Sequence, residues 1–149
     1  TFHAPGQLVC YPILDLTHHG QDVKKYVRDL EEALIRTIGP FGLEGLRFEG
    51  DNMSGVWLHR PPRKIASIGV HISKWVTTHG YALSVDLDTA PFTEWITACG
   101  LDAAFTTMAR ELDRPLRVDD VREAAAAAIA DVFDLAPAPP AADELLALA

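Results

Sequence analysis

Apolar residues alternate with small or polar residues in two stretches near the middle of the chain. In the first stretch, residues 65–73, the apolar side holds Ala66, Ile68, Val70 and Ile72, and the other side holds Ser67, Gly69 and His71. In the second, the apolar residues are Tyr81, Leu83, Val85 and Leu87, which alternate with Ala82, Ser84, Asp86 and Asp88. A period of two is typical of β-strands, so the pattern predicts two adjacent strands.

Helical spacing of apolar residues appears on both sides of these strands. Asp22 is placed to cap a helix that Gly39-Pro40 ends, and its apolar stripe is Val23, Tyr26, Val27, Leu30, Leu34 and Ile38. A last long helix opens at Asp119 or Asp120, where Glu123 would complete a capping box with Asp120. Its apolar stripe is Val121, Ala124, Ala125, Ala128, Val132 and Phe133.

Shorter segments fill the remaining chain. The run Leu8–Leu16 predicts a buried strand, and Pro12 inside it indicates a sheet edge or a bulge. Further predictions are strands at Leu46–Phe48 and Val56–Leu58, a helical turn at Ala90–Ile96 and a helix at Asp102–Leu112. Strands and helices are interspersed without strict alternation, which predicts the α+β class with a mixed β-sheet and packed helices.

Length and composition predict one soluble globular domain. The chain has 149 residues, with 48% hydrophobic and 23% charged residues, which is enough to bury a core. The Ala/Pro-rich residues 136–149 predict a linker and tail, so we expect the domain to span residues 1–135. No apolar run reaches the roughly 18 residues of a membrane span, and we expect a cytoplasmic protein without a membrane partner.

The charge distribution narrows the choice of partners. The formal net charge of −8 argues against nucleic-acid binding. No acidic residue lies between Asp51 and Asp86, whereas Arg60, Arg63, Lys64 and Lys74 fall there. A local basic surface would suit an acidic protein partner. The alternative, that these charges only solvate loops around a sheet, stays open.

Two residues are candidates for nucleophilic chemistry. A thiol such as that of Cys99 can accept an acyl group from a thioester at little energetic cost, and Gly100 after it allows close backbone approach. Lys64 shares its strand parity with Ala66 and Ile68, which predicts a side chain on the packed side of the sheet. Burial would favour the neutral amine, which could take the thiol proton. The alternatives are an inert buried cysteine and a solvated lysine at a strand end.

Other site types leave no trace in the sequence. Neither a Gly-rich phosphate loop nor a Gly-x-Ser-x-Gly nucleophile elbow is present. Three ligands at zinc spacing are also absent, so we expect no metal and propose no cofactor. The two cysteines do not make a disulfide framework, and Cys10 is interpreted as a buried thiol of the core.

Three separated segments resemble the octanoyltransferases of lipoate biosynthesis, the lipoyl(octanoyl) transferase family. They are Thr1–Val9, then Lys64–Val70 followed by Thr78–Leu83, and finally Ala98–Gly100. The resemblance runs from Thr1 to about residue 130. Ala4, Ser84 and Ala98 depart from the family's glycine, asparagine and proline. Because Thr1 falls inside the family's first motif, we expect a catalytic domain that lacks its N-terminal part.

The resemblance implies a fold, an activity and a set of site residues. The fold would be that of biotin and lipoate protein ligases. The activity would be transfer of an octanoyl group from octanoyl-acyl carrier protein, through a Cys99 thioester with Lys64 as proton relay, to a lysine of lipoyl domains in 2-oxoacid dehydrogenase complexes and of the glycine cleavage H protein. The implied acyl-binding residues are Thr1, Phe2, His3, Ser67, Ile68, Gly69, Gly80, Tyr81 and Ala82, and His79 is a further pocket candidate.

Two rival functions stay open at this stage. An ATP-dependent lipoate or biotin ligase of the same fold would need the lysine but not the cysteine. A non-catalytic remnant that binds acyl chains or lipoyl domains would need neither. Dependence on a nucleotide and dependence on Cys99 separate the three possibilities.

Overall fold

The computed structural model describes residues 3–50, 53–59, 61–88, 90 and 104–136. The predictions for Thr1, Phe2, Ala98, Cys99, and for residues 91–96 and 137–149 lie outside the described residues. The strands are β1 (Gln7–Cys10), β2 (Gly55–Leu58), β3 (Arg63–Ser73), β4 (Val76–Ser84) and β5 (Ala104–Phe105). The α-helices are α1 (Val23–Ile38), α3 (Met108–Leu112) and α4 (Val118–Val132), and two 3₁₀ helices are η1 (Leu16–His18) and η2 (Gly39–Phe41).

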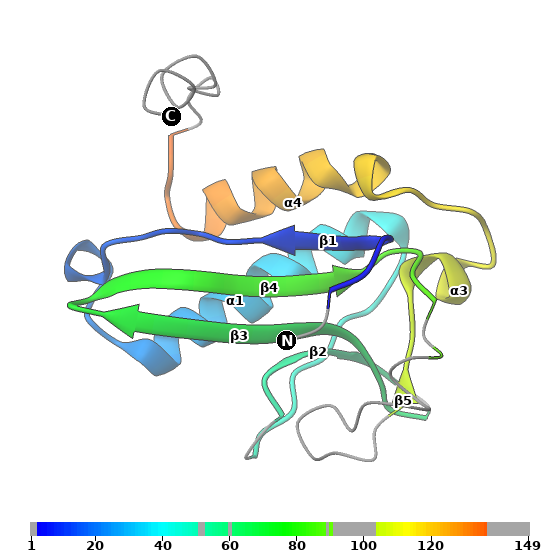
Figure 1. The fold of residues 1–149 in the computed structure, drawn as a ribbon, viewed down its shortest axis with the longest axis horizontal. Coiled ribbons are helices and arrows are strands. Elements are labelled where there is room, and N and C mark those ends of the chain that lie inside the picture. The colour runs from blue at the N-terminus through cyan, green and yellow to red at the C-terminus, as the bar shows by residue number, and fades with distance from the viewer. Residues whose placement is uncertain (1–2, 51–52, 60, 89, 91–103, 137–149) are drawn as a thin grey trace.

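The strands form one mixed sheet. Its order is β1-β4-β3-β2 with antiparallel neighbours, and β5 pairs with β3 in parallel. Figure 1 shows α1 passing behind β3 and β4, with α4 beside it along β1. We call the face that points to the viewer in Figure 1, opposite these helices, the front face. This arrangement confirms the predicted α+β class with helices packed on a mixed sheet.

Strand β1 is shorter than predicted because Pro12 interrupts it. The strand ends at Cys10 and pairs with β4. Hydrogen bonding to β4 resumes after the proline, where the Thr77 N–H donates to the Leu14 carbonyl at 3.0 Å and the Leu16 N–H donates to the Trp75 carbonyl at 2.8 Å. Proline has no N–H to give to a ladder, so the predicted strand is divided at this point.

The first helix confirms its prediction. The Asp22 carboxylate accepts from the Lys25 N–H at 3.0 Å and so caps α1. The buried face of α1 carries Tyr26, Leu30, Ala33, Leu34 and Ile38. The four larger residues of this face share one core with the apolar sides of β3 and β4 and with Val121, Ala125 and Phe133 near α4. Each large apolar side chain buried there contributes roughly 1.5–3 kcal/mol.

Further predicted elements differ from the structure. The alternation over residues 81–88 predicted a strand there, whereas β4 spans Val76–Ser84 and ends before Val85. Residues 46–48 make a single bridge, Leu46 to Trp57, in place of a strand. A helix was predicted over residues 102–112. In the described part of this range, from residue 104, β5 precedes the short α3, which Thr107 caps by accepting from the Arg110 N–H. Helix α4 begins at Val118, and Asp120 accepts from the Arg117 N–H at 2.8 Å from within the first turn, so Asp120 is not the first cap residue.

None of the described helices is both long and apolar enough to cross a membrane.

Candidate functional site

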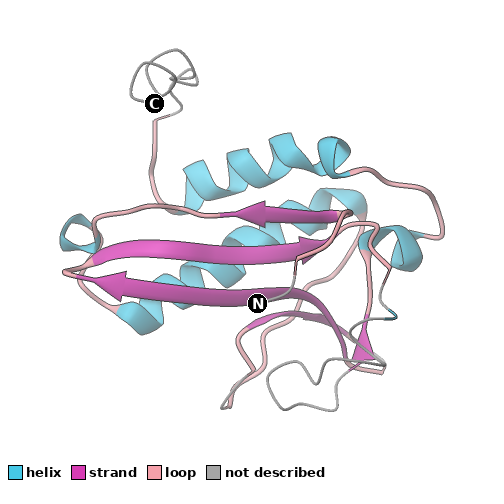
Figure 2. Ribbon diagram, in the orientation of Figure 1, coloured by secondary structure: helices cyan, strands magenta, loops and turns pink. Residues whose placement is uncertain are grey.

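The register of β3 and β4 brings two predicted segments together. Three predicted acyl-binding residues of β3 lie directly opposite three of β4, in the pairs Ser67–Ala82, Ile68–Tyr81 and Gly69–Gly80. Figure 2 shows these two strands as the longest of the sheet. Because paired residues share a face, Ser67, Gly69, Gly80 and Ala82 lie on one face, and Ile68 and Tyr81 lie on the other.

Ile68 and Tyr81 belong to the core. Tyr81 is 2% exposed and Ile68 packs against the same cluster, so only their backbones are available on the front face. The Tyr81 hydroxyl is buried beside the Cys10 thiol, but it makes no hydrogen bond of good geometry with any described residue. Burial, and then the neighbouring Cys10 thiol, raise the pKa of Tyr81. Burial also raises the pKa of the Cys10 thiol, which fits the predicted core cysteine.

A β-bulge places Lys64 on the front face. Val56 pairs with Ala66 and Trp57 pairs with Lys64, so Ile65 is an extra residue in β3. Ile65 and Ala66 both belong to the core, whereas Lys64 Nζ lies 5.2 Å from the centroid of the Trp57 ring. Lys64 is 3% exposed. Its burial agrees with the prediction, but its face does not, because the bulge shifts the alternation by one residue.

Gly55 makes room for Lys64. Its φ of +129° is unfavourable for other residues, and a Cβ there would lie 2.9 Å from Lys64 Cε and 2.2 Å from the Ala66 carbonyl oxygen. The Gly55 N–H donates at 3.1 Å to the carboxylate of Glu31, a buried residue of α1 that also binds Arg28 at 3.1 Å. Neither Gly55 nor Glu31 was singled out in the sequence; a glycine directly before a buried strand was the available signal.

The two glycines of the Gly69–Gly80 pair have different surroundings. A Cβ on Gly80 would lie 2.2 Å from the Cys10 carbonyl oxygen and 2.7 Å from Pro12 Cδ, so the approach of the β1 segment excludes a side chain. A Cβ on Gly69 would meet nothing within 4 Å. Packing therefore explains Gly80 but not Gly69, and the described residues leave space above Gly69.

Tyr11 contacts both His3 and His79 at the β1 side of the sheet. His3 Nε2 lies 3.3 Å from the Tyr11 hydroxyl, and His3 Nδ1 lies 3.2 Å from Gln7 Oε1. The Tyr11 and His79 rings pack edge to face at 5.6 Å. His79 holds a left-handed φ of +62°, which is rare for a residue with a side chain. Tyr11 lies within the run that predicted a buried strand, but it follows the end of β1 and is exposed, and it was not singled out in the sequence.

Ala4 lies in the same segment as His3. Its backbone is not among those with positive φ, so alanine in place of the family's glycine causes no strain there.

On the other side of Lys64, β5 and α3 form polar contacts with β3. The Thr106 N–H donates to the Lys64 carbonyl at 3.0 Å. Arg63 donates to Glu111 through both Nε, at 2.8 Å, and a terminal nitrogen, at 2.7 Å. The Thr106 hydroxyl donates to the same carboxylate at 2.5 Å. The Arg63 hydrogen bonds hold the pKa of Glu111 below its usual range, although partial burial opposes this effect.

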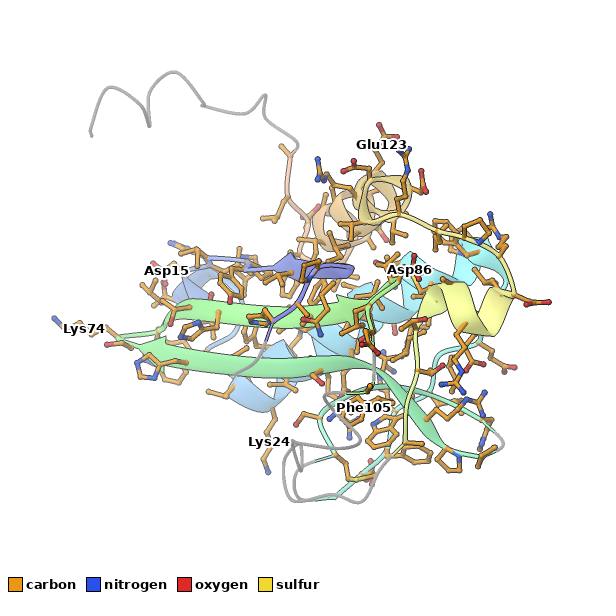
Figure 3. All side chains as sticks on the ribbon, turned by 45° about the vertical axis from the view of Figure 1, so that its right-hand side comes forward. Asp15, Lys24, Lys74, Asp86, Phe105 and Glu123 are labelled. Carbon is orange, nitrogen blue, oxygen red and sulfur yellow. The ribbon has the colours of Figure 1, made fainter. Side chains whose placement is uncertain are left out.

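A separate surface cleft of about 470 Å³ lies where β4 ends beside α3. Its charged lining residues are Asp86, Asp88, Arg110 and Arg114. Figure 3 labels Asp86 at this end of the sheet. The cleft contains none of the predicted site residues.

Within the described ranges, no three His, Cys, Asp or Glu side chains are grouped so that they could hold a metal ion.

Comparison with solved structures identifies the fold. The chain is similar to the biotin protein ligase of Aquifex aeolicus, with a TM-score of 0.66 and 12% identity over 87% of this chain and 53% of that one. It is equally similar to the bi-partite lipoate protein ligase of Thermoplasma acidophilum, with a TM-score of 0.65 and 16% identity over 96% of this chain and 58% of that one. These similarities confirm the predicted fold.

Sequence comparison gives more similar relatives. The octanoyltransferase of Chloroflexus aggregans is 45% identical over 139 residues, which are 92% of this chain and 62% of that protein. The octanoyltransferase of Mycobacterium tuberculosis strain H37Rv is 49% identical over 136 residues, 90% of this chain and 57% of that protein. The chain thus spans about three fifths of these relatives. The sequence profile of the lipoyl protein ligase A/B catalytic domain matches residues 1–130, and the chain therefore belongs to this family.

Proposed function

We propose that this chain carries the catalytic residues of an octanoyltransferase. The reaction moves an octanoyl group from octanoyl-acyl carrier protein to a lysine of a lipoyl-accepting domain, in 2-oxoacid dehydrogenase complexes or the glycine cleavage H protein. The octanoyltransferase relatives at 45% and 49% identity support this assignment. The structural observation that carries it is a buried lysine beside a floor of small residues, on the face of the sheet opposite helices α1 and α4.

Lys64 has the surroundings of a group that changes its protonation state. With 3% exposure its side chain has lost most of its contact with water. The face of the Trp57 ring at 5.2 Å stabilises a cation once it has formed. A lysine in this position is suited to take a proton during the reaction and to hold it until a leaving group needs it.

The floor of the proposed acyl site is built from the paired strands. Ser67, Gly69 and Ala82 present small side chains or none on the front face, and the space above Gly69 is clear of described residues. An alkyl chain that covers this floor gains roughly 0.8 kcal/mol for each buried methylene. The length of the floor would therefore select the length of the acyl chain.

The proposed chemistry has two half-reactions. Lys64 takes the Cys99 thiol proton, and the thiolate attacks the carbonyl carbon of the octanoyl thioester. The carbon–sulfur bond to the carrier then breaks, and the carrier thiolate takes the proton from Lys64. In the second half, the neutral amine of the acceptor lysine attacks the carbonyl carbon of octanoyl-S-Cys99, and the carbon–sulfur bond to Cys99 breaks. Lys64 takes the proton that the amine loses and passes it to the Cys99 thiolate, so that an amide forms and the thiol is restored. A thioester is converted to an amide, so no ATP is consumed.

The mass of the intact protein tests the first half-reaction. After brief mixing with octanoyl-acyl carrier protein, the native chain should gain one octanoyl group that hydroxylamine removes. Cys99→Ser should gain none, and Lys64→Met should gain it at least about 100-fold more slowly. Cys10→Ala is the matched control, because Cys10 is the only other cysteine and its pKa is raised by burial; it should acylate like the native chain.

A second candidate is an ATP-dependent ligase, because both structural neighbours named above are ligases. That reaction would join free octanoate or lipoate to the acceptor only in the presence of ATP, and Cys99→Ser would keep full activity. A folded chain that shows neither the adduct nor ATP-dependent ligation would instead indicate a non-catalytic binding protein.

A further inference from the structure

One polar cluster lies directly beside Lys64 and has no part in the chemistry proposed above. It consists of Arg63, Glu111 and Thr106, which we call the Arg63 cluster. The side chains of Arg63 and Glu111 are 23% and 17% exposed, and Thr106 is fully buried. The cluster joins three elements, since Arg63 begins β3, Thr106 follows β5 and Glu111 belongs to α3.

The contacts within the Arg63 cluster are close and charged. Two parallel hydrogen bonds, at 2.8 and 2.7 Å, join the Arg63 guanidinium to the Glu111 carboxylate, and the Thr106 hydroxyl adds a third at 2.5 Å. This two-point geometry fixes both the distance and the orientation of the partners. Arg63 also donates to the Pro61 carbonyl at 2.7 Å, so the turn before β3 is held as well.

The same elements hold the backbone of Lys64. Thr106 uses its hydroxyl for Glu111 and its N–H for the Lys64 carbonyl, at 3.0 Å. Phe105 pairs with Lys64 from one side and Trp57 pairs with it from the other. Figure 3 shows Phe105 next to this end of β3. A shift of α3 or β5 would therefore shift Lys64 as well.

We infer that the Arg63 cluster is a positioning device for Lys64, which ties the strand of the catalytic lysine to β5 and α3. The inference rests on the proposed role of Lys64. Placement errors of about 1 Å can cost 100-fold in rate. Loss of the cluster should therefore lower the rate of acylation strongly and change the affinity for the substrate little.

Glu111→Gln and Arg63→Lys test the inference in single-turnover acylation. Both variants keep the size of the side chain, but glutamine removes the charge and lysine removes the two-point contact. Each should acylate at least about tenfold more slowly at saturating donor, while the donor concentration for half-maximal rate changes less than about twofold. The exchanged pair Arg63→Glu with Glu111→Arg should recover part of the lost rate. Asp119→Asn, which breaks an exposed ion pair with Arg122 on α4, is the matched control and should acylate normally.

Hydrogen exchange of backbone amides provides a readout that does not need activity. In Glu111→Gln the Thr106 amide, which is bonded to the Lys64 carbonyl, should exchange about tenfold faster, with no change at Leu83 in β4. Native acylation together with native exchange at Thr106 in this variant would overturn the inference. If the native chain forms no acyl adduct, the proposed function fails, and exchange at Thr106 alone still decides whether the cluster holds Lys64.

Acid titration of stability checks that the pair is charged. The pKa of Glu111 is lowered in the folded chain, mainly by Arg63. The ionised carboxylate therefore stabilises the fold at pH values above the ordinary pKa of glutamate. This contribution is lost as the pH falls through the lowered pKa. The stability difference between the native chain and Glu111→Gln should therefore be largest near pH 7 and shrink toward pH 3. A difference that does not depend on pH would exclude the charged pair.

Discussion

Two buried tyrosines in the core differ in one hydrogen bond. The Tyr26 hydroxyl donates to the Pro12 carbonyl at 3.2 Å, whereas the Tyr81 hydroxyl has only the Cys10 thiol beside it and makes no hydrogen bond of good geometry among the described residues. Both side chains are 2% exposed. The pair therefore separates the benefit of a satisfied buried hydroxyl from the cost of an unsatisfied one.

Removal of the Tyr26 hydroxyl and removal of the Tyr81 hydroxyl should have different effects on the free energy of unfolding. Tyr26→Phe should lower the free energy of unfolding by about 1 kcal/mol, because it leaves the Pro12 carbonyl with one hydrogen bond fewer. Tyr81→Phe should leave it unchanged or raise it by up to about 1 kcal/mol, since it removes a polar group that pays a desolvation cost without a partner. Urea unfolding of both variants measures the difference. A loss of more than about 1 kcal/mol in Tyr81→Phe would show that its hydroxyl is bonded in solution.

The surroundings of Lys64 show how far single residues can be predicted from the sequence. Strand parity predicted a buried lysine, and the residue is buried. Parity could not predict its face, because the bulge at Ile65 depends on the register with β2. Glu111 was not singled out for the same reason: it lies 48 positions from Arg63, and only the folded chain brings the two side chains together.

At the scale of elements, the β3–β4 pair sets up a direct test of the acyl floor. Gly69 and Gly80 are opposite one another, but only Gly80 is closely approached by another backbone. A side chain at position 80 has to displace the β1 segment, whereas one at position 69 extends into space that no described residue fills. Addition of a side chain should therefore affect the structure at position 80 and the function at position 69.

Gly69→Val should fold with native stability and lose acylation. Valine suits an extended strand, but its side chain would occupy the floor on which the acyl chain is proposed to lie, so octanoyl transfer should fall at least about tenfold. Gly80→Ala should instead lower the free energy of unfolding by about 1–3 kcal/mol, through overpacking against Cys10 and Pro12. Urea unfolding and the octanoyl adduct assay separate the two effects. Native acylation in a folded Gly69→Val variant would move the acyl site away from β3.

The elements with local signals were the ones that the sequence predicted well. Helix α1 has a cap at Asp22 and an apolar stripe, and both were confirmed. Strand β3 was confirmed from its alternation, and β4 in part, because it covers Val76–Ser84 where the alternation ran over residues 81–88. The turn between them was not predicted, since Lys74 and Trp75 hold positive φ without glycine or asparagine. Strand β5 has no local signal, because two residues become a strand only through pairing with Arg63 and Lys64.

The whole molecule is organised around one core between the sheet and the helices α1 and α4. Phe133 closes this core after the end of α4, with its ring 5.8 Å from that of Tyr26 and 6.1 Å from that of His19. The fold class followed from the order of the elements, but the ligase-like fold came from resemblance to a family. Periodicity identifies strands and helices, whereas the order of strands in the sheet depends on contacts far apart in the chain.

The end of this core predicts which part of the chain is needed for stability. Deletion of residues 137–149 should change the free energy of unfolding by less than about 0.5 kcal/mol, because this Ala/Pro-rich segment has the composition of a linker. Phe133→Ala should cost about 3–5 kcal/mol, because it leaves a cavity against Tyr26. Urea unfolding of the shortened chain, with Phe133→Ala as the contrasting variant, measures both. A loss of more than about 1 kcal/mol on deletion would mean that the tail packs on the domain, and the boundary proposed after residue 135 would then be wrong.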